Sequence, residues 1–237
     1  MSNIVIPQGA TIIEAEAFAH RTDLTAITIP DSVTVIDDNA FFDCPSLETI
    51  VIPNSVRCIR YKAFYGCVNL KSVVLSNALT EIDEEVFEAC YSLESIVIPD
   101  SVEKIGGWAF NDCRKLISVT LSKGLREIGE KAFSGCALLE HINIPETVTQ
   151  IGWDAFCDCS SLKSIVIPNG VKKIDDGVFI NCKGLETITL PNSIRSIGGM
   201  SLAGCDSLKA IYVPKKSVEK FQRILPEELK DKVEIAE

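Results

Sequence analysis

Cysteine is the residue type in this sequence with the widest chemical scope. Ten cysteines occur in 237 residues, a number that in a short secreted chain would indicate a disulfide framework. Eight of them recur at a fixed spacing, at Cys44, Cys67, Cys90, Cys113, Cys136, Cys159, Cys182 and Cys205. Cys58 and Cys157 lie outside this series, and we expect them to be more exposed. Cys157-Asp158-Cys159 resembles half of a metal site, but no second Cys/His pair accompanies it, so zinc is not predicted.

Catalytic patterns are missing from the sequence. Its two histidines, His20 and His141, stand far apart, and no HExxH, G-x-S-x-G or Walker A motif occurs. Because a catalytic site needs convergent functional groups, we predict that the chain is not an enzyme and needs no cofactor. A hydrolase is kept as a remote alternative.

Composition restricts the partners and the environment. The formal net charge is −10, a sign that repels nucleic acid and anionic lipid, so neither is an expected partner. The sequence has no apolar run long enough to insert into a membrane. Met1-Ser2-Asn3-Ile4 offers no signal peptide. The chain as written reads as cytoplasmic, or as secreted or cell-surface if its N-terminus is truncated, and the localisation stays open.

An internal repeat of 23 residues explains the cysteine series. Phenylalanine recurs at positions 18, 41, 64, 87, 110, 133, 156 and 179, and Leu202 takes the next slot. The ladder cysteine comes three residues after the phenylalanine, and a leucine comes six residues after it. Two alternating aliphatic residues follow, as in Ile50 and Ile52, and then usually proline, as in Pro53.

Each part of the repeat predicts an element of structure. Alternating aliphatics indicate a short strand with one buried face, which the proline ends. The Ala40-Phe41-x-x-Cys44 spacing favours a single helical or 3-10 turn. Twenty-three residues are too few for a self-sufficient fold, so the repeats must stack as coils of a solenoid. The ladder cysteines then face inward as reduced thiols, because stacked Cβ atoms at ~4.8 Å are farther apart than the ~3.5–4.5 Å that a disulfide prefers.

The repeat resembles the BspA-like, or Treponema-pallidum-type, leucine-rich repeat. The pattern Leu-x-x-Ile-x-Ile/Leu-Pro-x-x-Val-x-x-Ile-Gly-x-x-Ala-Phe-x-x-Cys carries the resemblance from residue 4 to about 214. It implies an α/β, right-handed leucine-rich-repeat solenoid of about nine coils. A parallel β-sheet would line the concave face, with short helical or 3-10 turns on the convex face. The family is typical of bacterial surface proteins that bind host or neighbouring-cell proteins.

The two ends depart from the repeat. The chain starts directly in a predicted strand at Ile4-Val5-Ile6, whose exposed edge invites pairing with another chain. The oligomeric state stays open, with pairing through this N-terminal coil as one option. At the other end, Ser217 is expected to cap an amphipathic helix that Pro226 stops. We therefore divide the chain into a solenoid at 1–214 and a C-terminal helical cap at 215–237.

Two surfaces are candidates for partner binding. Outward strand positions on the concave sheet are small and β-prone, and the candidates are Val51, Val74, Val97, Thr120, His141, Asn143 and Tyr212. The second surface is a group of aromatic residues on the convex turns that the repeat does not require: Phe42, Tyr61, Tyr65 and Tyr91. Charges beside the strands nearly alternate from coil to coil, which predicts pairing between neighbouring coils.

A non-catalytic scaffold that binds a protein or peptide, through the concave sheet, is the function that these observations favour. The alternative is a bacterial cell-surface adhesin, or a fragment of one, that binds host or neighbouring-cell proteins.

Overall fold

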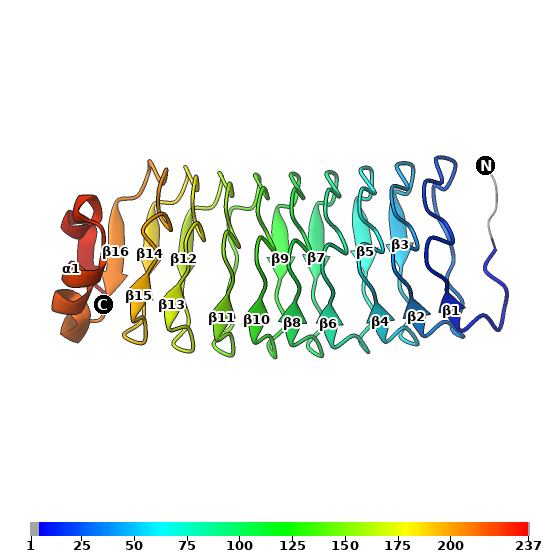
Figure 1. The fold of residues 1–237 in the computed structure, drawn as a ribbon, viewed down its shortest axis with the longest axis horizontal. Coiled ribbons are helices and arrows are strands. Elements are labelled where there is room, and N and C mark those ends of the chain that lie inside the picture. The colour runs from blue at the N-terminus through cyan, green and yellow to red at the C-terminus, as the bar shows by residue number, and fades with distance from the viewer. Residues whose placement is uncertain (1–4, 237) are drawn as a thin grey trace.

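The coils stand side by side along one long axis, with the two ends of the chain at opposite ends of the rod (Figure 1). The structure is a computed structural model and describes residues 5–236. Most coils contribute one short strand to each of two parallel rows and then turn back over a third side. The predicted solenoid of stacked 23-residue coils is confirmed.

The longer strands form what we call the main sheet. They are β3 (Thr49–Val51), β5 (Ser72–Val74), β7 (Ser95–Val97), β9 (Ser118–Thr120), β12 (Ser164–Val166), β14 (Thr187–Thr189) and β16 (Ala210–Val213). All pairings are parallel and one repeat apart, as in Val51 beside Val74. The central residue of β3, β5, β7, β9 and β12 is buried between two exposed ones, which confirms the predicted alternation.

The main sheet is interrupted in the coil that contains His141. Backbone hydrogen bonding divides it into two four-stranded parts, β3-β5-β7-β9 and β12-β14-β16-β17. Between them, His141 is joined to Ser118 by a single parallel bridge. His141 and Asn143 are exposed, as expected. Because only one bridge forms here, they do not lie in a regular strand.

A second row of two-residue strands was not predicted. It comprises β1 (Ile12–Ile13), β2 (Val35–Ile36), β4 (Cys58–Ile59), β6 (Glu81–Ile82), β8 (Lys104–Ile105), β10 (Glu127–Ile128), β11 (Gln150–Ile151), β13 (Lys173–Ile174) and β15 (Ser196–Ile197). Each contributes one deeply buried or half-buried isoleucine to the core. A segment of two residues is too short to show an alternating pattern in the sequence. It is recognised as a strand only by its pairing with the equivalent residues of the next coil.

The third side, which we call the turn face, differs from the prediction. Residues 38–43 and their equivalents form turns, not helical or 3-10 turns. Asn39 and Asp43 have φ of 56° and 51°, in the left-handed region, which a right-handed helical turn does not use. The backbone N–H of Phe41 donates to the carbonyl of Ala63 at 2.8 Å. Bonds between coils therefore alternate with single bonds within the turn, such as the Phe42 N–H donating to the carbonyl of Asn39 at 2.9 Å, and no continuous helical ladder forms.

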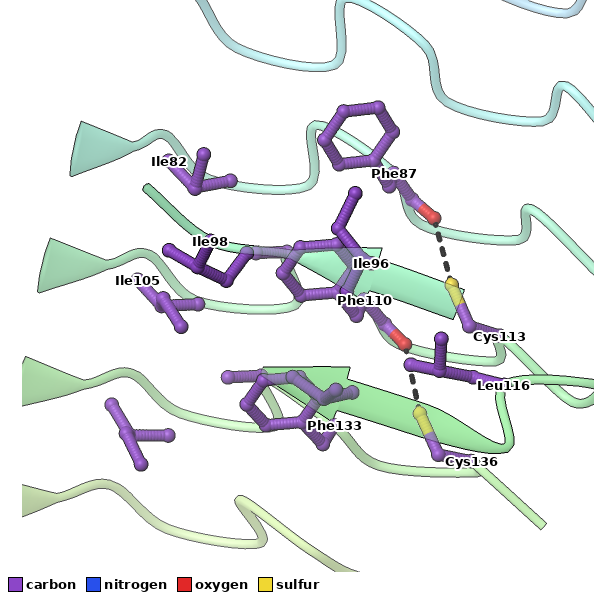
Figure 2. Close-up of a cluster of buried hydrophobic side chains, with 14 of the residues drawn as sticks. Ile82, Phe87, Ile96, Ile98, Ile105, Phe110, Cys113, Leu116, Phe133 and Cys136 are labelled. Atoms are coloured by element: carbon purple, nitrogen blue, oxygen red, sulfur yellow. Dashed lines mark hydrogen bonds between the residues drawn. The ribbon is translucent and has the colours of Figure 1, made fainter. Parts of the chain in front are cut away.

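Stacked side chains fill the interior (Figure 2). Phenylalanines from Phe18 to Phe179 stack face to face, with ring centroids 5.1 to 5.7 Å apart. The thiol of Cys113 donates to the carbonyl oxygen of Phe87 at 3.3 Å, and this contact recurs along the ladder. All ten cysteines are free, including the eight of the ladder, for which reduced thiols were predicted. Cys58 and Cys157 are half-buried, so they are less exposed than the sequence suggested.

The C-terminal segment covers the last coil. It consists of two 3-10 helices, η1 (Lys215–Ser217) and η2 (Glu227–Lys232), with α1 (Val218–Ile224) between them, and ends in β17 (Val233–Ile235). Phe221 and Leu225 are buried against the core, and β17 pairs in parallel with β16. Ser217 stands at the start of α1 without a capping bond; its hydroxyl donates to Oδ1 of Asn192 instead.

The predicted N-terminal strand is only partly visible. Ile4 lies outside the described residues, and Val5 makes an isolated bridge to Thr28. Pairing with another chain at this end, and the division at residue 214, stay predictions. None of the helices within residues 5–236 has the length and apolar character needed to cross a membrane.

Candidate functional site

A column of valines runs along the outer surface of the main sheet. The exposed fractions are 61% for Val51, 57% for Val74, 64% for Val97 and 58% for Val166. Thr120 and Asn143 occupy the two positions between Val97 and Val166 and are also exposed. Parallel pairing holds neighbouring members side by side, as Val97 beside Thr120. The sheet thus presents an uncharged row to solvent, with a break in strand pairing at Asn143.

Charged side chains flank this row and pair with one another. Lys71 Nζ lies 2.8 Å from Glu48 Oε2, and Lys209 Nζ lies 2.6 Å from Glu186 Oε2. The hydrogen bond from Lys209 lowers the pKa of Glu186, and the bond to Glu48 raises the pKa of Lys71. The coil-to-coil charge pairing predicted from the sequence is confirmed at these two places. Ile117 interrupts the same column and is 54% exposed.

Two shallow cavities open along the row. One, of about 110 Å³, lies at the break in the main sheet and is lined by His141, Asn143 and Val166, among others. The other, of about 620 Å³, lies at the C-terminal end, where Tyr212 meets Thr189 and Glu234. Tyr212 is half-buried there, because β17 covers one side of its strand.

The aromatic residues of the turn face form one stack and one separate pair. The rings of Phe42 and Tyr65 stack with centroids 4.9 Å apart. The ammonium group of Lys62 lies over the rings of both Tyr61 and Tyr65, at 4.9 and 5.2 Å. Tyr91 instead lies under the guanidinium of Arg114, 4.5 Å away. Of the four residues predicted to form one surface, Phe42, Tyr61 and Tyr65 form a half-buried cluster. Tyr91 contacts the guanidinium of Arg114 instead.

Two glutamates beside this cluster could not be recognised from the sequence. Glu85 accepts a hydrogen bond from the Tyr61 hydroxyl at 3.0 Å and lies 3.1 Å from Lys62 Nζ. Hydrogen bonding to Tyr61 and Glu85 raises the pKa of Lys62 above its usual value. Burial, together with the neighbouring Glu85, raises the pKa of Glu88 to about 7. These groups already satisfy one another, so the cluster is tightly bonded within the chain.

Groupings suited to metal binding are not seen in the part of the chain that the structure describes. Nowhere within residues 5–236 do three His, Cys, Asp or Glu side chains converge on a point that could hold a metal ion. His20 contacts Asp43 and Phe42 on the turn face, whereas His141 lies at the break in the main sheet. The arrangement is suited to surface contact.

Comparison with known proteins identifies the repeat. The model of the BspA type leucine rich repeat region, with six copies, matches residues 1–117 and 108–225. The chain belongs to the BspA-type leucine-rich repeat family. Comparison with curated proteins gave no match. Repeat proteins of this family are typically non-catalytic scaffolds for protein interaction.

Solved structures similar to this BspA-type chain share its fold. A leucine-rich repeat protein from Bacteroides ovatus is 31% identical over 85% of this chain, with a TM-score of 0.67. This chain spans 58% of the Bacteroides chain. The T. pallidum leucine-rich repeat protein is 27% identical, covers 90% of this chain and 86% of its own, and has a TM-score of 0.57. A Eubacterium ventriosum protein is 24% identical over 79% of this chain and 60% of its own, with a TM-score of 0.51.

Proposed function

We propose that this BspA-type chain is a non-catalytic scaffold that binds a protein or peptide across the outer surface of its main sheet. The observation that carries the proposal is the row of exposed valines. Val51, Val74 and Val97 occupy the same position in successive coils and are more than half exposed. β-branched side chains suit a strand whether or not it binds a partner. The repeat does not require the outward positions to be uncharged, however, so an exposed row without charges favours contact with a partner.

The surroundings of the row favour a protein ligand. Covering an exposed valine contributes on the order of 1 kcal/mol, so binding needs several coils at once and hence an extended partner. The flanking charges at Glu48 and Lys71 are already paired, and a partner would contact them at the rim of the interface, where charges are common. By contrast, the polar groups around Phe42 and Tyr65 are engaged within the chain, so we place the turn face second.

Selection from a random peptide display library tests the proposal without a known partner. Peptides selected on the wild type should fail to bind Val74→Lys/Val97→Lys, because two ammonium groups would stand in the centre of the apolar row. The matched control is Thr80→Lys/Ser101→Lys, which adds the same charge to exposed positions of the same two coils outside the main sheet. Equal binding by wild type and both variants would exclude the main sheet as the binding surface.

Two narrower points remain predictions. A role as a cell-surface adhesin requires the chain to be accessible on intact source cells, which antibody labelling of unbroken cells would test. The absence of catalysis would be contradicted by turnover in a broad hydrolase substrate screen, provided that the activity stays with the purified chain.

A further inference from the structure

Three cationic side chains converge at the junction between the last coils and the C-terminal segment. Lys172 and Arg195 occupy the same repeat position in successive coils, just before β13 and β15, and Lys220 lies on α1. Together with Asn192, Ser193 and Ile194 they line a cavity of about 530 Å³. This concentration of positive charge stands out in a chain whose net charge is −10.

Lys172 and Arg195 form a like-charged pair without a carboxylate. They are direct neighbours, since the backbone N–H of Arg195 donates to the carbonyl of Lys172 at 2.7 Å. Within residues 5–236, neither side chain takes part in an ion pair of 4.0 Å or less. At the same repeat position elsewhere, Arg126 instead lies 3.3 Å from Glu103. Like charges on neighbouring strands are destabilising, so this pair lacks a structural reason.

The third cation is fixed in place by the coil beneath it. Lys220 Nζ donates to the backbone carbonyl of Asn192 at 2.5 Å and lies 3.5 Å from its Oδ1. Ser217 donates to the same Oδ1 at 2.7 Å. The side-chain oxygen of Asn192 is therefore occupied, whereas its Nδ2 donates to no acceptor among the described residues. The cavity is thus lined by the amide donor of Asn192 and by three cationic side chains, of which Lys220 is held in place by hydrogen bonds.

We propose that this cavity binds a phosphate group. A phosphate monoester carries about −1.5 to −2 charges at neutral pH, which matches a pair of cations on neighbouring coils with a third above them. The planar guanidinium of Arg195 can donate two parallel hydrogen bonds to phosphate oxygens, and Asn192 supplies a further neutral donor. The inference is independent of the main-sheet proposal, because the cavity lies between the second row and α1.

Titration with inorganic phosphate, followed by amide chemical shifts in NMR at constant ionic strength, tests the proposal. The wild type should show saturable shifts at Lys172 and across 192–195. Arg195→Gln should bind phosphate about tenfold more weakly or worse, since one charge-assisted contact is lost. The matched control, Arg57→Gln, removes an exposed arginine from the same repeat position in an earlier coil and should bind like the wild type.

Additional ligands define the chemical class and its source. Acetate should bind far more weakly than phosphate. A short phosphoserine peptide that binds more tightly than inorganic phosphate would point to a phosphorylated protein as the source, and equal binding would point to a free phosphate compound. The proposal is overturned if shifts are non-saturable and scattered over the surface lysines, if Arg195→Gln binds like Arg57→Gln, or if acetate binds as well as phosphate.

Discussion

Two aromatic stacks lie side by side in this solenoid, one inside the core and one on the turn face. Phe41 and Phe64 stack inside at 5.1 Å, and the next residues along the chain, Phe42 and Tyr65, stack outside at 4.9 Å. The inner stack continues through the coils, whereas the outer position changes to Glu88 in the following coil. The spacing of the coils therefore sets the distance between stacked rings in both columns. Only the fully buried column keeps phenylalanine in the following coil.

The largest expected difference between inside and outside concerns thiol reactivity. In the folded chain, Cys113 should react with iodoacetamide at pH 8 about a thousandfold more slowly than Cys58. Burial raises the pKa of Cys113 well above that of a free thiol, and reaching it requires an opening of the coil stack that costs about 4–5 kcal/mol. Cys58 is half-buried, and its pKa is raised less strongly by the same cause. Peptide mass spectrometry after timed quenching measures each site.

Cys157 extends this comparison because it occupies the same repeat position as Phe42, Tyr65 and Glu88, which we call the outer column. Its pKa is raised to about 12, first by burial and then by Asp158, so its labelling rate should rise steeply with pH while Cys113 stays protected. In concentrated urea all ten sites should react alike, which controls for digestion and detection. Rapid labelling of Cys113 in the native chain would show that the coils open far more easily than a packed stack allows.

A second large contrast is expected between two neighbouring residues of one coil. Phe64→Ala should lower the free energy of unfolding by about 3–5 kcal/mol, because it leaves a cavity in a fully buried stack. Tyr65→Ala should cost about 1 kcal/mol, since its ring is half-buried and stacks on one aromatic neighbour. Urea denaturation followed by circular dichroism compares the two. Similar losses would mean that the outer stack supports the fold as much as the core does.

The interior was predictable from the sequence because every coil repeats the same surroundings. Phe64, Cys67 and Leu70 each meet copies of themselves one coil away, so the 23-residue period alone places them. The outward positions of β5 and β7 follow from the same register. The turn conformation was predicted wrongly, although Asp43 and Gly66 at the left-handed position offered a signal, since aspartate and glycine tolerate positive φ.

Two kinds of feature could not be predicted: strands too short to show a period, and contacts that depend on departures from the repeat. The second row consists of strands too short to show a period, such as Cys58–Ile59. The cavity at Lys172 and Arg195 requires Lys220, which α1 brings back over the last coils from outside the repeat. The surroundings of Glu88 likewise depend on which residues its neighbouring coils happen to place beside it. Sequence periodicity places the scaffold and the outward row of the main sheet, whereas the cavity at Arg195 and the surroundings of Glu88 depend on individual residues that break the repeat.

The smallest expected effect concerns Glu88, where the outer column changes from aromatic to acidic. Burial and Glu85 raise its pKa to about 7, although Asn111 Nδ2 donates to Glu88 Oε1 at 2.9 Å. The folded chain therefore binds more protons at this site than the unfolded chain between about pH 4.5 and 7. The associated stability is present below about pH 4.5 and is lost as the pH rises through about 7.

Glu88→Gln imitates the protonated side chain and should remove this pH dependence. At pH 8 the variant should unfold at higher urea concentration than the wild type, and at about pH 4.5 the two should agree. The effect should be well below that of Phe64→Ala, because Glu88 is only partly buried and solvent weakens its electrostatic interactions. Glu84→Gln, which neutralises an exposed glutamate of the same coil, is the matched control and should leave the pH profile unchanged. If Glu84→Gln and Glu88→Gln shift the profile equally, the cause is the net charge of the chain, and the outer column provides no special environment at Glu88.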